Sequence, residues 1–290
     1  MATVTKPASD TVSSKPVKVA VVGLGWVALH RHIPAIQRNP AFELVGVIDL
    51  GCGDGKLTAI LLDEVGPRRL VGIDLDPLET AAARRFPFYE RVHNCPGNAI
   101  PEPEATFDFV LSNSVLEHIP DLEKTIAEAA RALKPQGRFV FTVPGPAFHT
   151  NLAGSLSGRV PRESYLATLD RRLAHHHYLS KSEWVAMCQR NDLVLDDCLG
   201  YLDRKETQRW ESLSRATGGL LYNVFGERQR PIEIQRAMGA RALQTAARLP
   251  APVASGLASI VALGLSGTRT DTAWMDPAQA SCLLIAGHRS

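Results

Sequence analysis

The chain has 290 residues, of which 45% are hydrophobic, so it can build one large α/β domain or two small ones. Its 32 Lys and Arg residues nearly balance its 30 Asp and Glu residues, which gives no indication of a nucleic-acid partner. The five cysteines are scattered and form no Cys-x-x-Cys pair, so a reducing, cytoplasmic setting is favoured over a disulfide framework or a zinc site.

Two segments have compositions that bear on targeting. Residues 1–16 are rich in Ser and Thr and lack an apolar stretch, which predicts a disordered tail and not a secretory signal. Residues 249–266 carry no charge but are short and interrupted by Pro and Gly, which favours a buried or substrate-covering helix. A weak membrane-surface contact through this segment is the alternative.

Strands and helices are expected to alternate through the first half of the chain. Apolar strands are predicted at 17–22, 42–50, 68–75, 107–114 and 138–144, and helices at 26–38, 55–66, 77–86 and 121–133, with a turn at 134–137. This alternation is typical of a doubly wound parallel sheet with helices on both faces.

The second half has a different texture. Residues 145–178 are expected to be rich in loops, and a helix over 180–191 should be capped by Ser180 or Ser182. A strand over 193–202, a mostly helical stretch over 205–265 and a last strand over 280–289 complete the pattern. The sequence therefore predicts a helical insertion before the last strand.

A glycine-rich turn follows the strand that ends at Asp49. Residues 49–55 read DLGCGDG, and glycines at alternate positions suit positive φ angles and close approach of a ligand to the backbone. Asp74 ends the next strand, 25 residues after Asp49, where a carboxylate can accept hydrogen bonds from two ribose hydroxyls. The carboxyl ends of such strands form the ligand-binding edge of an open α/β sheet.

These motifs resemble those of the class I S-adenosylmethionine (SAM)-dependent methyltransferases. The resemblance rests on DLGCGDG, on VLEHIPD at 115–121, on LKPQG at 133–137, on the segment that begins at His175 and on the final strand. It covers roughly residues 44–205 and the last ten residues, with the motifs in family order. It implies a Rossmann-like fold with SAM as the cofactor. The cofactor contacts that it implies are Asp49, Gly51, Cys52, Gly53, Asp74, Leu75, Asp76, Asn98, Ala99 and Ser114.

Two of these positions differ from a simple contact. Asn98 stands where the family often has Asp, although its side-chain oxygen can still accept a hydrogen bond from the adenine amino group. We expect Cys52 to be a small packing residue and not a nucleophile.

The candidates for a general base or a substrate contact lie farther along the chain. They are His149, His177 and Tyr178, with His175 and His176 in the same run. Glu117 and His118 are expected to cap and orient the helix after the fourth strand. No metal site is predicted, because adjacent histidines do not share a helix face and no carboxylate lies at ligand spacing.

The front of the chain shows a second pattern. Gly23-x-Gly25-x-x-Ala28 follows a strand and opens a helix, and Asp49 lies 24 residues beyond Gly25. Residues 17–49 resemble the N-terminal unit of the Gfo/Idh/MocA oxidoreductases, and His32, Pro34 and Ala35 fit that pattern. The family's later lysine motif and large sheet domain do not follow.

The two patterns meet in one strand. A dehydrogenase-like unit needs the strand over 44–49 to pair with 17–22, whereas a methyltransferase sheet gives it two other neighbours. A strand has only two edges, so we expect the methyltransferase pairing to prevail and residues 17–26 to lie at an edge, pack elsewhere or stay partly disordered. The sequence favours a fusion that joins near 44–49.

The leading hypothesis is SAM-dependent methyl transfer to a small or lipid-like acceptor by in-line displacement. It divides the chain into the tail 1–16, a dehydrogenase-like fragment 17–43 and a methyltransferase domain 44–290, in which 205–265 is a helical cover. The alternatives are an NAD(P)-binding oxidoreductase fragment and a non-catalytic SAM-binding fusion protein.

Overall fold

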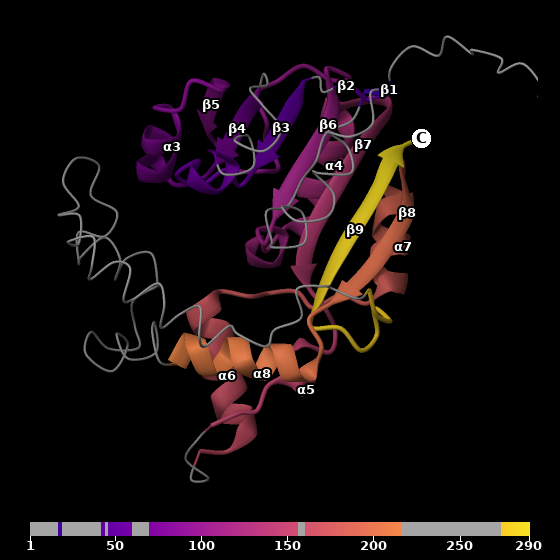
Figure 1. The fold of residues 1–290 in the computed structure, drawn as a ribbon. Helices are drawn as coiled ribbons and strands as arrows, with labels where there is room; N and C mark the ends of the chain where they lie inside the picture. The colour runs from indigo at the N-terminus through magenta and orange to yellow at the C-terminus, as the bar shows by residue number, and fades with distance from the viewer. Residues whose placement is uncertain (1–16, 19–41, 44–45, 60–69, 156–159, 216–273) are drawn as a thin grey trace, which may run out of the picture.

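The structure is a computed structural model, and it describes residues 17–18, 42–43, 46–59, 70–155, 160–215 and 274–290 (Figure 1). The tail, the Gly23-x-Gly25-x-x-Ala28 motif and the segment 249–266 lie outside the described residues. So does most of the predicted helical cover. No helix of the described part is long and apolar enough to cross a membrane.

A seven-stranded sheet forms the centre of the fold. Its strands are β3 (Val47–Leu50), β4 (Leu70–Asp74), β5 (Tyr89–Asn94), β6 (Phe107–Asn113), β7 (Leu133–Pro144), β8 (Leu193–Tyr201) and β9 (Cys282–Arg289). The order across the sheet is β5-β4-β3-β6-β7-β9-β8. The first five strands in this order are parallel, and β9 runs antiparallel to both β7 and β8. The predicted Rossmann-like sheet is confirmed, and its last strand, β9, is antiparallel to its neighbours.

The strand that two patterns claimed is divided along its length. Val47, Ile48 and Asp49 pair with β4 on one side and with β6 on the other, as the methyltransferase pattern predicts. A separate two-stranded parallel sheet joins β1 (Val17–Lys18) to β2 (Phe42–Glu43). Three partners are therefore accommodated, because the two pairings use different residues of one stretch.

Side chains of alternate strand residues point to two separate cores. Ile48 and Val110 belong to the larger core, together with Ile126 of α4 (Leu122–Ala132) and Trp184 of α7 (Lys181–Arg190). The strand neighbours Val47 and Phe109 belong to the smaller core, together with Ala83 of α3 (Pro77–Ala83). Because successive strand residues face opposite sides of a sheet, helices cover both faces.

Helix starts follow the expected chemistry. Ser180 caps α7: its side chain accepts a hydrogen bond from Glu183 N, and the Glu183 carboxylate accepts one from Ser180 N. This reciprocal capping box selects Ser180 over Ser182. Asp76 caps α3 in front of Pro77, a residue that suits the first helical position.

Three elements differ from the sequence prediction. Strand β5 was not expected, and α5 (Phe148–Asn151) and α6 (Arg162–Leu173) occupy the stretch predicted as loops. The turn 134–137 lies within β7 as a bulge, because Leu133 pairs with Phe107 whereas Arg138 pairs with Phe109.

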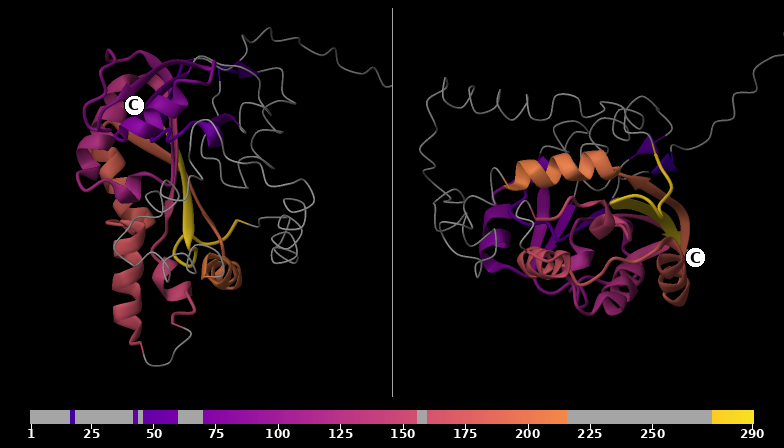
Figure 2. Two further views of the ribbon diagram at one scale, coloured as in Figure 1. Left: turned by 90° about the vertical axis from the view of Figure 1, so that its left-hand side faces the viewer. Right: turned by 90° about the horizontal axis from the view of Figure 1, so that it is seen from below.

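Helices α5, α6 and α8 (Arg204–Ser214) lie together beyond the end of the sheet where β7 ends and β9 begins (Figures 1 and 2).

Candidate functional site

The glycine turn follows β3 and rests on the end of β4. Gly51 and Cys52 both donate their backbone N–H groups to the carbonyl of Ile73, over 2.7 and 3.0 Å. Gly51 has φ +82°, and a Cβ there would lie 2.3 Å from Cγ2 of Val115, so only glycine fits. Gly53 has φ +52°, yet a Cβ there would meet nothing closer than Oε2 of Glu79 at 3.8 Å. The backbone at Gly53 is therefore open to a ligand.

Asp74 lies beside this turn, as predicted. Its Oδ2 accepts a hydrogen bond from Gly53 N and its Oδ1 accepts one from Asp76 N, both over 2.9 Å. A carboxylate oxygen has two lone pairs, so each keeps one for a further donor. Burial raises the pKa of Asp74 above its ordinary value, although both backbone bonds act in the opposite direction.

Asp49 lies beneath the turn and is 3% exposed. Its Oδ2 accepts hydrogen bonds from the Thr58 hydroxyl over 2.7 Å and from the Tyr89 hydroxyl over 2.5 Å. Burial raises the pKa of the Asp49 carboxyl. These contacts tie β3, the following helical turn and β5 together, and the contact of Asp49 with the cofactor stays a prediction.

Cys52 packs in the smaller core beside Leu70 and Tyr89 and is 6% exposed. Burial raises the pKa of its thiol, which favours the packing role over a nucleophilic one.

The other predicted cofactor positions follow the ends of neighbouring strands. Leu75 is 70% exposed directly after β4, and Oδ1 of Asp76 accepts from Leu78 N and Glu79 N at the start of α3. Asn98 and Ala99 are exposed in the loop after β5, and Ser114 is exposed at the end of β6 with φ +51°. The predicted positions thus gather at one edge of the sheet.

Asn94 contributes to this edge and was missed. Its side-chain amide donates to the carbonyls of Asp74 (3.1 Å) and Leu75 (2.8 Å), which fixes the backbone where β4 ends. The sequence signal was weak, because the two apolar residues of YERVHN, Tyr89 and Val92, are three positions apart and do not show the two-residue alternation of a strand.

Asp170 on α6 joins two of the three predicted catalytic candidates. Its Oδ1 accepts hydrogen bonds from Nε2 of His149 over 2.8 Å and from the hydroxyl of Tyr178 over 2.5 Å. Nδ1 of His175 lies 2.9 Å from the same Tyr178 hydroxyl, and Phe148 stacks on the Tyr178 ring. Asp170 was missed because its segment was expected to be a loop.

His177, the third catalytic candidate, contacts a different part of the chain. Nε2 of His177 donates to the carbonyl of Ile119 over 2.8 Å, so the structure does not join His177 to His149 and Tyr178. Burial raises the pKa of Tyr178 well above its ordinary value, and the hydrogen bond to Asp170 raises this pKa further. Tyr178 therefore keeps its proton at neutral pH, which favours a hydrogen-bonding role over that of a base.

Glu117 and His118 form the short helix η2 (Leu116–His118), which follows β6. The expected capping of α4 is not seen for Glu117, because its Oε2 has no hydrogen-bond partner among the described residues. Instead the backbone carbonyl of Glu117 accepts from His176 N over 2.8 Å, which holds the loop between α6 and α7 against η2.

The sheet order, the glycine turn after β3 and the acid at the end of β4 define an α/β protein of the class I methyltransferase type. A family model described as a methyltransferase domain matches residues 29–197, which is more than half of the chain. The chain belongs to this methyltransferase-domain family.

Curated relatives match part of the chain. A probable S-adenosylmethionine-dependent methyltransferase of Mycolicibacterium smegmatis is 34% identical over 101 residues, which are 34% of this chain and 37% of that protein. A trans-aconitate 2-methyltransferase of Escherichia coli is 32% identical over 127 residues, which are 40% of this chain and 50% of that protein. The chain thus spans half or less of the length of these relatives. The names of these relatives agree with the methyltransferase family expected from the motifs.

Solved structures share the fold at low identity. The YcgJ protein of Bacillus subtilis superimposes with a TM-score of 0.50 and 15% identity, covering 90% of this chain and 97% of that one. The [4+2]-cyclase SpnF superimposes with a TM-score of 0.51 and 14% identity, covering 90% and 80%. Because a cyclase shares this fold, the superposition supports the architecture and no particular activity.

Proposed function

We propose that this chain binds SAM across the carboxyl edge of β3 and β4 and transfers its methyl group to a small or lipid-like acceptor. The observation that carries this proposal is the bond between Gly53 N and Asp74 Oδ2, which joins an open glycine turn to an acid with remaining acceptor capacity. The family membership and the names of the relatives support the same activity.

The residues at this edge suit such a cofactor. Gly53 allows the backbone to approach the amino-acid portion, and Asp74 can accept from two ribose hydroxyls. Asp76, Asn98 and Ser114 follow at the ends of neighbouring strands and would provide further polar contacts. When bound, SAM supplies an electrophilic methyl group on sulfur. The chain would place the acceptor in line with that methyl and exclude water.

The acceptor side would be formed by the His149–Asp170–Tyr178 group. Asp170 accepts from both neighbours, so it can hold the His149 ring and the Tyr178 hydroxyl in fixed orientations. We propose His149 as the group that would take a proton from the acceptor, Tyr178 as a hydrogen-bonding contact, and His177 as a substrate contact. Replacing His149 with Gln should lower kcat and leave SAM affinity unchanged.

The acceptor class is supported by two separate observations. One relative is named for methylation of trans-aconitate, a small molecule. The uncharged stretch 249–266 favours an apolar cover, which is the reason to include lipid-like acceptors and a weak membrane-surface contact. Small carboxylic acids and amphiphilic hydroxyl compounds are therefore the two sets of acceptors to test first.

Calorimetry with S-adenosylhomocysteine (SAH), followed by transfer of labelled methyl from SAM to these acceptors, tests the proposal. We expect SAH to bind in the micromolar range and NADH not to bind. Binding of NADH without SAH would favour the oxidoreductase alternative. Binding of SAH with no turnover on any acceptor would favour a non-catalytic SAM-binding protein.

We also propose that residues 44–290 act as the methyltransferase domain and that 17–43 is a separate addition. Support comes from the β1–β2 pair, which is not part of the main sheet. Replacing Lys18 with Pro removes a backbone donor from β1. This change should leave the affinity for SAH unaltered. A large loss of affinity would mean that residues 17–43 form part of the cofactor site.

A further inference from the structure

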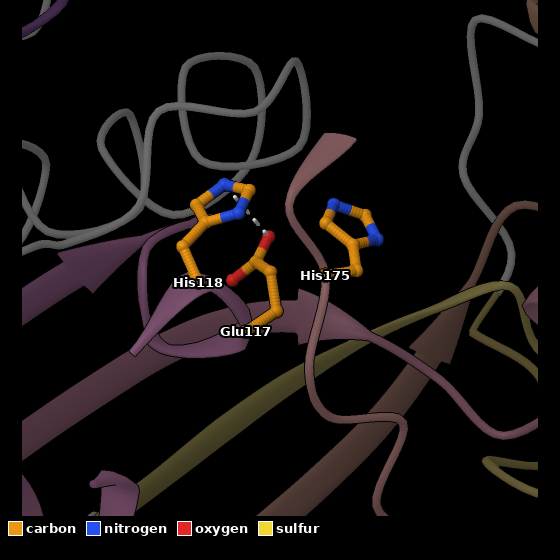
Figure 3. A group of neighbouring side chains, drawn as sticks. All are labelled: Glu117, His118 and His175. Carbon is orange, nitrogen blue, oxygen red and sulfur yellow. Dashed lines mark ion pairs between the residues drawn. The ribbon is translucent and has the colours of Figure 1, made fainter. Parts of the chain in front are cut away.

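Three metal-ligating side chains converge at the end of β6. Glu117 and His118 come from η2, and His175 comes from the loop between α6 and α7, so the group is assembled from distant parts of the chain. One donor atom from each residue lies within 4.8 Å of the other two. Figure 3 shows the Glu117 carboxylate between the two rings.

One oxygen of the Glu117 carboxylate is buried without a hydrogen-bond partner among the described residues. The side chain is 3% exposed, and the oxygen without a partner is Oε2. Burying an ionised carboxylate is strongly unfavourable unless a cation or hydrogen-bond donors accompany it. Nε2 of His118 lies 4.0 Å from Oε1, which is too far for a hydrogen bond, so Oε2 still lacks a donor.

His118 presents a lone pair to this carboxylate. Its Nδ1 lies 3.1 Å from the carbonyl of Ala174, and because a carbonyl can only accept, Nδ1 carries the proton. Nε2 of the neutral ring then has the lone pair, and it lies 4.0 Å from Oε1 of Glu117. A hydrogen bond from the other ring nitrogen to a backbone carbonyl is the usual way in which metal-binding histidines are oriented.

His175 is oriented in the same manner. The single proton of the Tyr178 hydroxyl is donated to Asp170, so the Tyr178 oxygen accepts from Nδ1–H of His175. The lone pair of His175 is then on Nε2. Figure 3 shows one ring nitrogen of His175 turned toward Glu117 and His118 and the other turned away.

We propose that Glu117, His118 and His175 bind a divalent transition-metal ion through one carboxylate oxygen and two Nε2 atoms. Two imidazoles and one carboxylate suit Zn²⁺, Fe²⁺, Co²⁺ or Ni²⁺ better than Mg²⁺ or Ca²⁺, which prefer oxygen ligands. Bound donors lie about 2 Å from such an ion, so the partly exposed His118 ring turns inward on binding. The sequence argument against a metal considered only local spacing, whereas the carboxylate comes from a distant element.

Cobalt provides a direct test on the full-length chain, prepared without a polyhistidine tag and dialysed against chelator. We expect one Co²⁺ per chain, with visible d–d absorption that Zn²⁺ abolishes. Glu117→Gln, His118→Gln and His175→Gln should each weaken Co²⁺ binding by about tenfold or more. His176→Gln is the matched control, because His176 belongs to the same histidine run but not to the group, and it should bind as the wild type does.

The outcomes separate clearly. No Co²⁺ or Zn²⁺ binding by the wild type overturns the site, as does equal binding by the wild type and the three variants. Equal losses in the His176→Gln control would assign the metal to the histidine run and not to this group. SAH affinity and thermal unfolding, measured on each variant without metal, show that the variants are folded. Because the readout is metal binding, the test is independent of the proposed methyl transfer.

Discussion

Gly53 donates its backbone N–H to Oδ2 of Asp74 over 2.9 Å, and this bond joins the turn after β3 to the end of β4. The second oxygen of Asp74 is held by Asp76 N at the same distance. The carboxylate is thereby fixed in plane and in position before any ligand arrives, which reduces the entropy that binding must overcome.

Replacing Asp74 with Asn should weaken cofactor binding. An amide has one oxygen and one NH₂ group, so one of the two backbone N–H groups then faces a donor and a ribose acceptor is lost. We expect the Kd for SAH to rise about 10- to 100-fold, equivalent to about 1.4–2.8 kcal/mol, as measured by calorimetry. Glu104→Gln, at an exposed loop position, is the control. Unchanged affinity in Asp74→Asn would remove the ribose role.

The sequence predicted this part of the site because its signals are local. A glycine turn directly after an apolar strand, and an acid directly after the next, place Gly53 and Asp74 at one edge of any parallel sheet. Asp170 and His175 could not be placed in the same way. Their contacts depend on how α6 and its following loop fold back on η2, and the composition of residues 145–178 indicated loops.

The strand 42–50 shows a different limit. Its residues fitted the patterns of two families, and an argument from two strand edges required one pairing to be lost. The structure divides the stretch, with Phe42–Glu43 in one sheet and Val47–Leu50 in another. Periodicity indicates that a segment is extended, but it does not indicate where the segment changes partners.

Gly51 and Gly53 should respond differently to substitution by Ala. Gly51→Ala places a Cβ 2.3 Å from Val115, at a positive φ, so we expect a loss of about 2–4 kcal/mol in the free energy of unfolding. The double variant Gly51→Ala/Val115→Ala removes the contacts with both Val115 methyl groups, leaves the Cβ of residue 115 at 2.9 Å, and should recover part of that loss. Urea denaturation measures both.

Gly53→Ala meets no neighbour within 3.8 Å, so its loss of stability should be only about 1 kcal/mol. Its added methyl group lies where the backbone is open to the ligand, so the Kd for SAH should rise. A Gly53→Ala variant that loses stability but binds SAH with the Kd of the wild type would contradict the proposed site.

Asp49 should make the stability of the fold depend on pH. Burial raises its folded-state pKa above the unfolded value of 3.8, so the folded state binds more protons than the unfolded state between those two values. The free energy of unfolding contributed by Asp49 is therefore fully present below pH 3.8 and is lost as the pH rises through the folded-state pKa.

Asp49→Asn should reduce this dependence. The Asn side-chain oxygen can still accept from Thr58 and Tyr89, and the buried charge is absent. The stability of Asp49→Asn relative to the wild type should thus increase with pH, as measured by denaturation between pH 4 and 8. Asp197→Asn, at an exposed position, should show no such trend. If the free energy of unfolding of Asp49→Asn differed from that of the wild type by the same amount at all pH values, Asp49 would not ionise with a raised pKa in the folded state.

Glu211 should be a main determinant of how α8 is attached to the rest of the fold. It is 2% exposed and accepts hydrogen bonds from Ala153 N (2.7 Å), the Tyr165 hydroxyl (2.5 Å) and Arg215 Nη2 (2.6 Å). Glu211→Ala removes the buried carboxylate that these partly buried donors share, although Arg215 Nη2 keeps its bond to the carbonyl of Gly154, so we expect a loss of about 2–4 kcal/mol in the free energy of unfolding. Glu163→Ala, on the exposed side of α6, should cost less than about 0.5 kcal/mol. Similar losses in the two variants would show that α8 is held by apolar packing and not by this buried carboxylate.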